Sequence, residues 1–170
     1  MIQSTAIMSQ EENNQPNLST SLEVDQKQAK KNDTMWKKRV NFFRLVYTYL
    51  QTHKQAPELI EDSELINPNE NGVDLQVLLE NVITHYDEYA NEVAKYLKQG
   101  WTFDRINDIE KALFLCALAE FNVLHTDKKV IIDQTIITCK RYDNIGAYKF
   151  VNAILDKLLV VHKDNEQTNN

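Results

Sequence analysis

The chain has 170 residues and a mass of 19.8 kDa, and it is 42% hydrophobic and 26% charged, which is typical of one folded domain of ordinary size. Its 3 glycines and 3 prolines are too few for a protein of many short strands joined by tight turns. No apolar stretch is long enough to span a membrane and no secretory signal is visible, so we expect a cytoplasmic protein.

The net charge of −6 is divided unevenly along the chain. Residues 27–44 contain seven Lys and Arg residues and one acid, whereas residues 56–92 contain ten acids and neither Lys nor Arg. An anionic ligand responds to the local field more than to the net charge, so the basic segment remains a candidate binding surface. A solvated helix face is the alternative interpretation of such a segment.

Residues 1–33 are rich in Gln, Asn, Ser and Thr and poor in large apolar residues, which predicts a disordered N-terminal tail. The folded domain is predicted over 34–163, with a second disordered tail over 164–170. A first helix should begin with Asp33 or Thr34 as its N-cap. Its apolar positions recur at spacings of three and four, as one face of a helix requires: Trp36, Val40, Phe43, Tyr47 and Leu50.

Residues 53–71 contain two prolines and several Asn and Glu residues, which predicts a loop pinned to the core by apolar side chains. The candidates for this pinning are Leu59, Ile60, Leu65 and Ile66. From Gly72 to about Lys98, apolar stripes at helical spacing predict two further helices. Gly100 is a suitable residue to stop the second of them.

The segment 105–124 is predicted as a helix buried on every side, because residues 112–121 are apolar all round apart from Glu120. We interpret Glu120 as a paired or rim carboxylate. A helix with Asp133 as N-cap should follow up to about Tyr142, and after a break at Gly146 a last helix is expected over 147–161. No strand is convincing, so the sequence predicts an all-α bundle with one central helix.

No chemistry of an enzyme is visible in the chain. Glycine-rich phosphate loops and nucleophile motifs are absent from the sequence, and the 4 histidines are scattered over separate elements without metal-ligand spacing. The two cysteines, Cys116 and Cys139, lie in apolar segments and are predicted to be buried free thiols. We therefore expect a binding protein without a metal or another cofactor.

The C-terminal half carries a more specific pattern. Its parts are Trp101, Arg105, Ile109-Glu110-Lys111-Ala112, Ala117, Glu120, Lys129-Val130, Ile132 and the run Lys149-Phe150-Val151-Asn152-Ala153-Ile154-Leu155-Asp156-Lys157. Over about residues 36–52 and 100–159 the chain resembles the NusB family of bacterial transcription antitermination factors. Residues 53–99 match in helical pattern only.

The resemblance implies an all-α fold of two perpendicular three-helix bundles around the central buried helix. It implies a non-enzymatic role, in which the protein binds boxA-type single-stranded RNA together with the ribosomal protein NusE. The resulting complex helps RNA polymerase to read through terminators in ribosomal RNA operons. Members of the family occur as monomers and as dimers, so either state is compatible with the sequence.

The resemblance also implies an RNA surface on the first helix and at the start of the last helix. The residues that it predicts for RNA binding are Lys37, Lys38, Arg39, Arg44, Tyr47, Lys149 and Phe150. Lys and Arg release counterions from phosphates, and exposed aromatic rings stack on bases. Tyr47 and Phe150 also lie on apolar stripes, so a core position is the alternative for both rings.

Glu110 matches an acidic position that the family presents to NusE, although the favourable helix dipole also explains an acid at a helix start. Several positions depart from the family pattern, where Arg is frequent in place of Leu115, Asn-Glu in place of Asp133-Gln134, and an acid in place of Gly146. These departures and the acidic net charge leave one alternative function, a helical protein–protein adaptor that has lost boxA binding.

Overall fold

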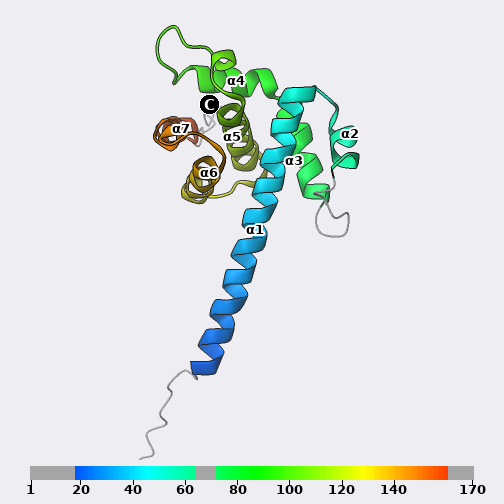
Figure 1. Cartoon of the computed structure of the whole chain (residues 1–170), viewed down its shortest axis with the longest axis vertical. Helices are drawn as coiled ribbons and strands as arrows, with labels where there is room; N and C mark the ends of the chain where they lie inside the picture. The colour runs from blue at the N-terminus through cyan, green and yellow to red at the C-terminus, as the bar shows by residue number, and fades with distance from the viewer. Residues whose placement is uncertain (1–17, 64–71, 161–170) are drawn as a thin grey trace, which may run out of the picture. The chain divides into compact units, whose positions relative to one another are not determined.

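In a computed structural model of the chain, residues 18–63 and 72–160 are described, and they form helices and turns without a strand (Figure 1). The all-α prediction is therefore confirmed for this part of the chain. The elements are α1 (Leu18–Thr52), α2 (Ala56–Glu61), α3 (Gly72–Thr84), α4 (Tyr86–Ala94), a 3₁₀ turn η1 (Phe103–Arg105), α5 (Asp108–Ala119), a π-helical turn η2 (Glu120–Leu124), α6 (Lys128–Tyr142) and α7 (Ala147–Leu158).

The first helix begins earlier than the sequence predicted. α1 starts at Leu18, so the predicted N-cap at Asp33 or Thr34 is wrong, and residues 18–33 are helical where we expected a disordered tail. The segment contains three Lys, two Gln, two Leu, one Glu and one Ala, whose helix propensities are high even without a continuous apolar face to bury. The chain divides into two compact units between Met35 and Trp36, and residues 1–17 lie outside the described part.

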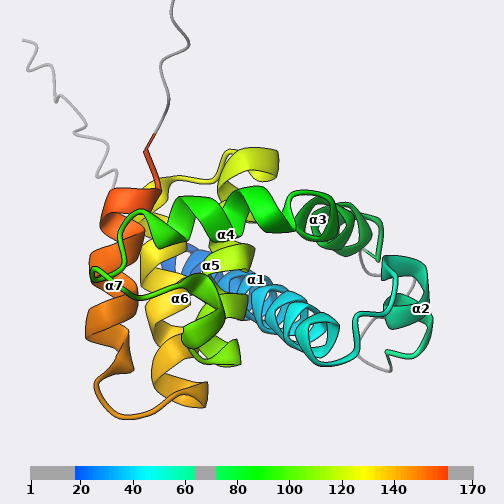
Figure 2. The same ribbon diagram turned by 90° about the horizontal axis from the view of Figure 1, so that it is seen from above.

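The second unit is organised around α5, which contacts α3, α4, α6 and α7 (Figures 1 and 2). Seven of its twelve residues are buried, and Phe114 and Leu115 are fully enclosed. When neighbouring helices cover a helix that is apolar on every side, no polar side chains have to be removed from water. Its burial is favourable by roughly 25 cal/mol per Å² of apolar surface. The prediction of a central buried helix is confirmed.

Side-chain caps set where the central and following helices begin. The Asn107 side chain accepts a hydrogen bond from the Glu110 backbone N–H at 2.8 Å and so caps α5. Asp127 caps α6 by accepting from Lys129 N at 2.9 Å, so the predicted cap at Asp133 is wrong and α6 begins nearly two turns earlier. The β-branched run after Lys129 enters the helix because Ile131 is 1% exposed and packs in the core.

Two further differences concern segments near turns. The predicted loop over 53–71 contains the short helix α2, with Pro57 in its first turn, and Leu59 and Ile60 pack on the core as expected. Leu65 and Ile66 lie outside the described residues. Gly146, at φ +96°, separates α6 from α7, and this left-handed backbone explains why glycine suits the break. The last helix ends at Leu158 rather than near 161.

Both cysteines are free, as the sequence predicted. Burial raises the pKa of the Cys116 thiol well above its ordinary value, and the charge of Glu120 raises it further. Burial and then the nearby acids Asp143 and Glu110 raise the pKa of Cys139 to about 11. Both sulfurs therefore stay protonated at neutral pH, and neither can act as a thiolate nucleophile.

The raised thiol pKa values predict a loss of stability in alkali. The folded chain holds protons that the unfolded chain releases near its ordinary cysteine pKa, 9.0, so the free energy of unfolding should fall as pH rises from about 9 toward about 11. Urea unfolding at pH 8 and pH 10.5 measures this fall. The fall should be shallower for Cys139→Ala, in which Cys116 and tyrosines with raised pKa values, such as Tyr89, account for the part that remains. Equal falls in both proteins would contradict the assignment.

Candidate nucleic-acid interface

The residues predicted to bind RNA lie on two helices of the second unit. α1 carries Lys37, Lys38, Arg39, Arg44 and Tyr47, and α7 carries Lys149 and Phe150 near its start. Lys37, Arg44, Tyr47 and Lys149 are exposed, whereas Lys38, Arg39 and Phe150 are partly buried. Tyr47 is 37% exposed, so part of its side chain is accessible to a ligand.

Arg39 is engaged in an ion pair inside the protein. Its Nη2 lies 2.6 Å from Glu120 Oε1, and its Nε donates to both carboxylate oxygens at 3.1 Å. The side chains are 19% and 11% exposed, which confirms the interpretation of Glu120 as a paired carboxylate. This pair joins α1 to the π-helical turn η2, and it leaves Arg39 less accessible to phosphates than its neighbours.

Phe150 and Lys149 differ in exposure although they are adjacent. The Phe150 ring packs edge-on against Phe114 of α5, with centroids 6.0 Å apart, and is partly buried. Lys149 is exposed and lines a groove of about 750 Å³ between α6 and α7, where Lys140 Nζ lies 4.6 Å from the centre of the Tyr148 ring. The start of α7 thus offers cations next to an aromatic ring, while Phe150 mainly fills the core.

Tyr142 contacts the predicted RNA surface but was not among the residues predicted from the sequence. Arg44 Nη2 donates to Tyr142 Oη at 3.2 Å, and the Tyr142 ring packs against Phe43 at 5.4 Å between centroids. Tyr142 ends α6, so this contact joins α6 to α1 beside two of the predicted residues, Arg44 and Tyr47. The signal present in the sequence was the Arg141-Tyr142 pair at the end of a basic helix.

Glu110 lies in an acidic region at the start of α5. It is half-buried, and burial and then the charge of Asp143 raise its pKa. Asn107 connects the two acids, because its amide caps Glu110 N and its Nδ2 donates to Asp143 Oδ1 at 3.4 Å. Asp143 Oδ2 is buried and finds no hydrogen-bond partner in the described part of the chain. A cationic group of a binding partner would stabilise the charged forms of Glu110 and Asp143.

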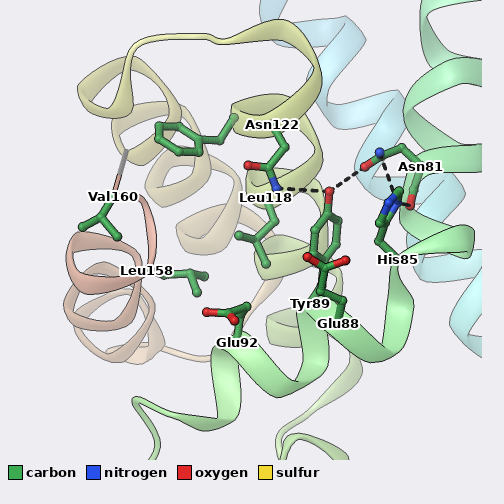
Figure 3. A pocket seen from close by; sticks show the side chains of 10 residues that line it. Asn81, His85, Glu88, Tyr89, Glu92, Leu118, Asn122, Leu158 and Val160 are labelled. Carbon is green, nitrogen blue, oxygen red and sulfur yellow. Dashed lines mark hydrogen bonds between the residues drawn. The ribbon is translucent and has the colours of Figure 1, made fainter. Parts of the chain in front are cut away.

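A separate polar pocket of about 310 Å³ lies between α3, α4, η2 and the end of α7 (Figure 3). Tyr89 Oη donates to Asn81 Oδ1 at 2.6 Å and accepts from Asn122 at 3.2 Å, and His85 Nδ1 lies 3.0 Å from the Asn81 carbonyl oxygen. The rest of its lining is Glu88, Glu92, Leu118, Phe121, Leu158 and Val160. It shares no residue with the predicted interface, and the network in it ties η2 to α3 and α4.

Within residues 18–63 and 72–160, no group of three or more His, Cys, Asp or Glu side chains is arranged to hold a metal ion. None of the helices in the same ranges is both long and apolar enough to cross a membrane. The described helices define the chain as an all-α protein that carries a basic surface with aromatic rings on α1 and α7.

Comparison with known proteins specifies this class. The model of the NusB family matches residues 37–159. The transcription antitermination protein NusB of Wolinella succinogenes is 31% identical over 118 residues, which are 67% of this chain and 85% of that protein. The NusB of Fusobacterium nucleatum is 29% identical over 148 residues, which cover 81% of this chain and 95% of the relative.

A solved structure of Thermotoga maritima NusB has the same fold, with a TM-score of 0.65 at 18% identity, over 73% of this chain and 89% of the other. The family model covers more than half of the chain, which therefore belongs to the NusB family. The relatives are named as transcription antitermination proteins, so the general role of this chain is in transcription antitermination and not in catalysis.

The ion pair between Arg39 and Glu120 makes a prediction about stability. Arg39→Ala should lower the free energy of unfolding by about 1–3 kcal/mol, because it leaves a mostly buried carboxylate without its partner. Lys95→Ala, which removes an exposed ion pair with Glu92, is the control and should change little. Thermal or urea unfolding measures both variants. Equal effects would contradict a structural role for the Arg39 pair.

Proposed function

We propose that this chain binds boxA-type single-stranded RNA together with the ribosomal protein NusE, and that the complex helps RNA polymerase to read through terminators in ribosomal RNA operons in the cytoplasm. The observation that carries the proposal is the group of exposed cations and Tyr47 on α1, in a chain that belongs to a family of antitermination proteins.

The chemistry of this surface suits a single strand. Lys37, Lys38 and Arg44 of α1 can neutralise phosphates with release of counterions, and Lys149 adds a cation from the start of α7. Tyr47 offers a ring on which a base can stack, which is possible when bases are not paired in a duplex. In this proposal Arg39 contributes mainly by holding α1 to η2.

The acidic region at Glu110 supports a separate contact with NusE. Two neighbouring acids, with one buried and unpartnered carboxylate oxygen, favour the approach of a basic side chain. We propose Glu110 as the residue that receives it, with Asp143 behind it.

Removing cations from α1 should weaken RNA binding and reduce its salt dependence. For the double variant Lys37→Ala/Lys38→Ala, the slope of log affinity against log salt should become less steep by about one to two units, at roughly 0.7 per phosphate contact with a single strand. Fluorescence anisotropy with a labelled boxA RNA and a scrambled control, with and without NusE, measures it. Lys95→Ala/Lys98→Ala, with the same change of charge just after α4, is the matched control.

The outcomes of this experiment separate the two functions. Preference for boxA that increases with NusE, together with a lower slope for the α1 variant only, supports the proposal. Binding of NusE without preference for boxA would favour the adaptor function, which the internal pairing of Arg39 also favours. Equal slopes for both double variants would show that the RNA site lies elsewhere.

Replacing Glu110 should weaken NusE binding. For Glu110→Gln we expect about a tenfold loss of affinity, since a hydrogen bond between charged groups is lost. In the native chain, affinity should also fall as the pH is lowered through the raised pKa of Glu110, because the protonated acid attracts a cation less. Titration calorimetry at pH 5 and 7 measures both effects. Glu80→Gln on α3 is the control, and a pH dependence that persists in Glu110→Gln would contradict this role.

A further inference from the structure

Aromatic rings and guanidinium groups alternate across the junction of α1 and α6. The Arg141 Cζ lies 5.2 Å from the centre of the Trp36 ring and 5.8 Å from that of Tyr142. The Arg44 Cζ lies 5.9 Å from the centre of the Tyr142 ring. We name these four residues, Trp36, Arg141, Tyr142 and Arg44, the aromatic–arginine row.

The row has the exposure that a binding surface needs. Arg44 and Arg141 are exposed, and Trp36 and Tyr142 are partly exposed. In the described part of the chain neither guanidinium forms an ion pair with a carboxylate, which distinguishes them from Arg39. Asp143, which is next in sequence, has its carboxylate turned to Asn107 and Asn144 N.

Two features of the row are unfavourable in the free protein. Arg44 and Arg141 place two like charges near one ring without an intervening anion. In addition, Trp36 Nε1 is buried and has no hydrogen-bond acceptor among the described residues. A buried donor without an acceptor destabilises the folded state. An anionic ligand would relieve the first feature, because its phosphates would neutralise the two guanidinium charges.

The row also continues the surface already proposed for RNA. Exposed Arg44 belongs to both surfaces, and the buried ring of Phe43 supports Tyr142 and Tyr47 from beneath, at 5.4 and 6.4 Å between centroids. A strand that contacts Tyr47 and Arg44 therefore has a route across Tyr142 and Arg141 to Trp36. The planar guanidinium and the ring faces suit unpaired bases, which stack on aromatic and arginine side chains.

We infer that the aromatic–arginine row is a second contact site for single-stranded RNA, in which Arg141, Tyr142 and Trp36 stack on bases and the guanidinium groups of Arg44 and Arg141 pair with phosphates of the strand. The inference rests on the proposed function and extends its site from α1 to the end of α6. Acidic peptides could use the two charges but not the rings, so they provide a competing outcome for the test.

The test compares Arg141→Ala with Arg105→Ala. Arg105 makes the same kind of contact with Trp101, at 5.9 Å, but lies outside the row. With labelled boxA RNA and NusE, Arg141→Ala should lose about tenfold in affinity and Arg105→Ala should lose little. Arg141→Lys keeps the charge without the plane and should recover part of the loss. Arg141 is exposed, so the fold should survive, and circular dichroism checks it.

A second readout reports on Trp36 directly. In a Trp101→Phe background Trp36 is the remaining tryptophan, so its fluorescence should be quenched by single-stranded RNA and less so by a duplex of the same sequence. If Arg141→Ala binds RNA with native affinity and the Trp36 fluorescence does not respond to RNA, the row is not an RNA site, and the proposed function still stands. Quenching by polyglutamate equal to that by RNA would also overturn it. Absence of RNA binding by the unaltered chain would overturn both proposals.

Discussion

The burial of α5 is the constraint on which the rest of the second unit depends. A helix without a polar face cannot rest on a surface, so other helices have to cover all of its sides, and α3, α4, α6 and α7 do so. This requirement brings the end of α6 next to α1, where Arg44 and Tyr142 meet although they are 98 residues apart in sequence. The surface that we propose for binding is therefore a consequence of how the other helices cover α5.

Leu115 illustrates the connection between core and surface. It is fully buried in α5, at a position where the resemblance led us to expect a frequent Arg. A cation at that position in this packing would be desolvated without a partner, so apolar character there is consistent with the core as it stands. In this chain the positive charge of the proposed interface is supplied instead by α1, by the end of α6 and by the start of α7.

Much of the fold could be predicted from periodicity, and the differences have physical causes. The stripes on α3, α4 and α5 predicted helices correctly because an amphipathic or fully apolar pattern records which residues are buried. The start of α1 was missed because a polar helix has propensity but no stripe, and the cap of α6 was missed because Asp127 and Asp133 are equally good caps in sequence. Tertiary packing of Ile131 decides between them.

The candidate site was less accessible from the sequence than the fold. From the sequence, the Lys and Arg residues of α1 all look like exposed positive charges. In the structure, Arg39 turns inward to Glu120, which is 81 residues away, while Arg44 turns to Tyr142. Such pairings depend on which helix faces which, and spacing along one helix does not contain that information. Phe150 and Tyr47 were equally ambiguous, and exposure separates them.

The π-helical turn η2 restricts insertions and deletions between α5 and α6. Between α5 and His125 the backbone uses a wider turn, and within it Glu120 reaches Arg39 on α1 while Asn122 reaches Tyr89 on α4. Removing one residue would restore an ordinary helix but would rotate the downstream residues by about 100°. One of the two partners would then be out of reach, so the number of residues in this turn is fixed by two distant contacts at once.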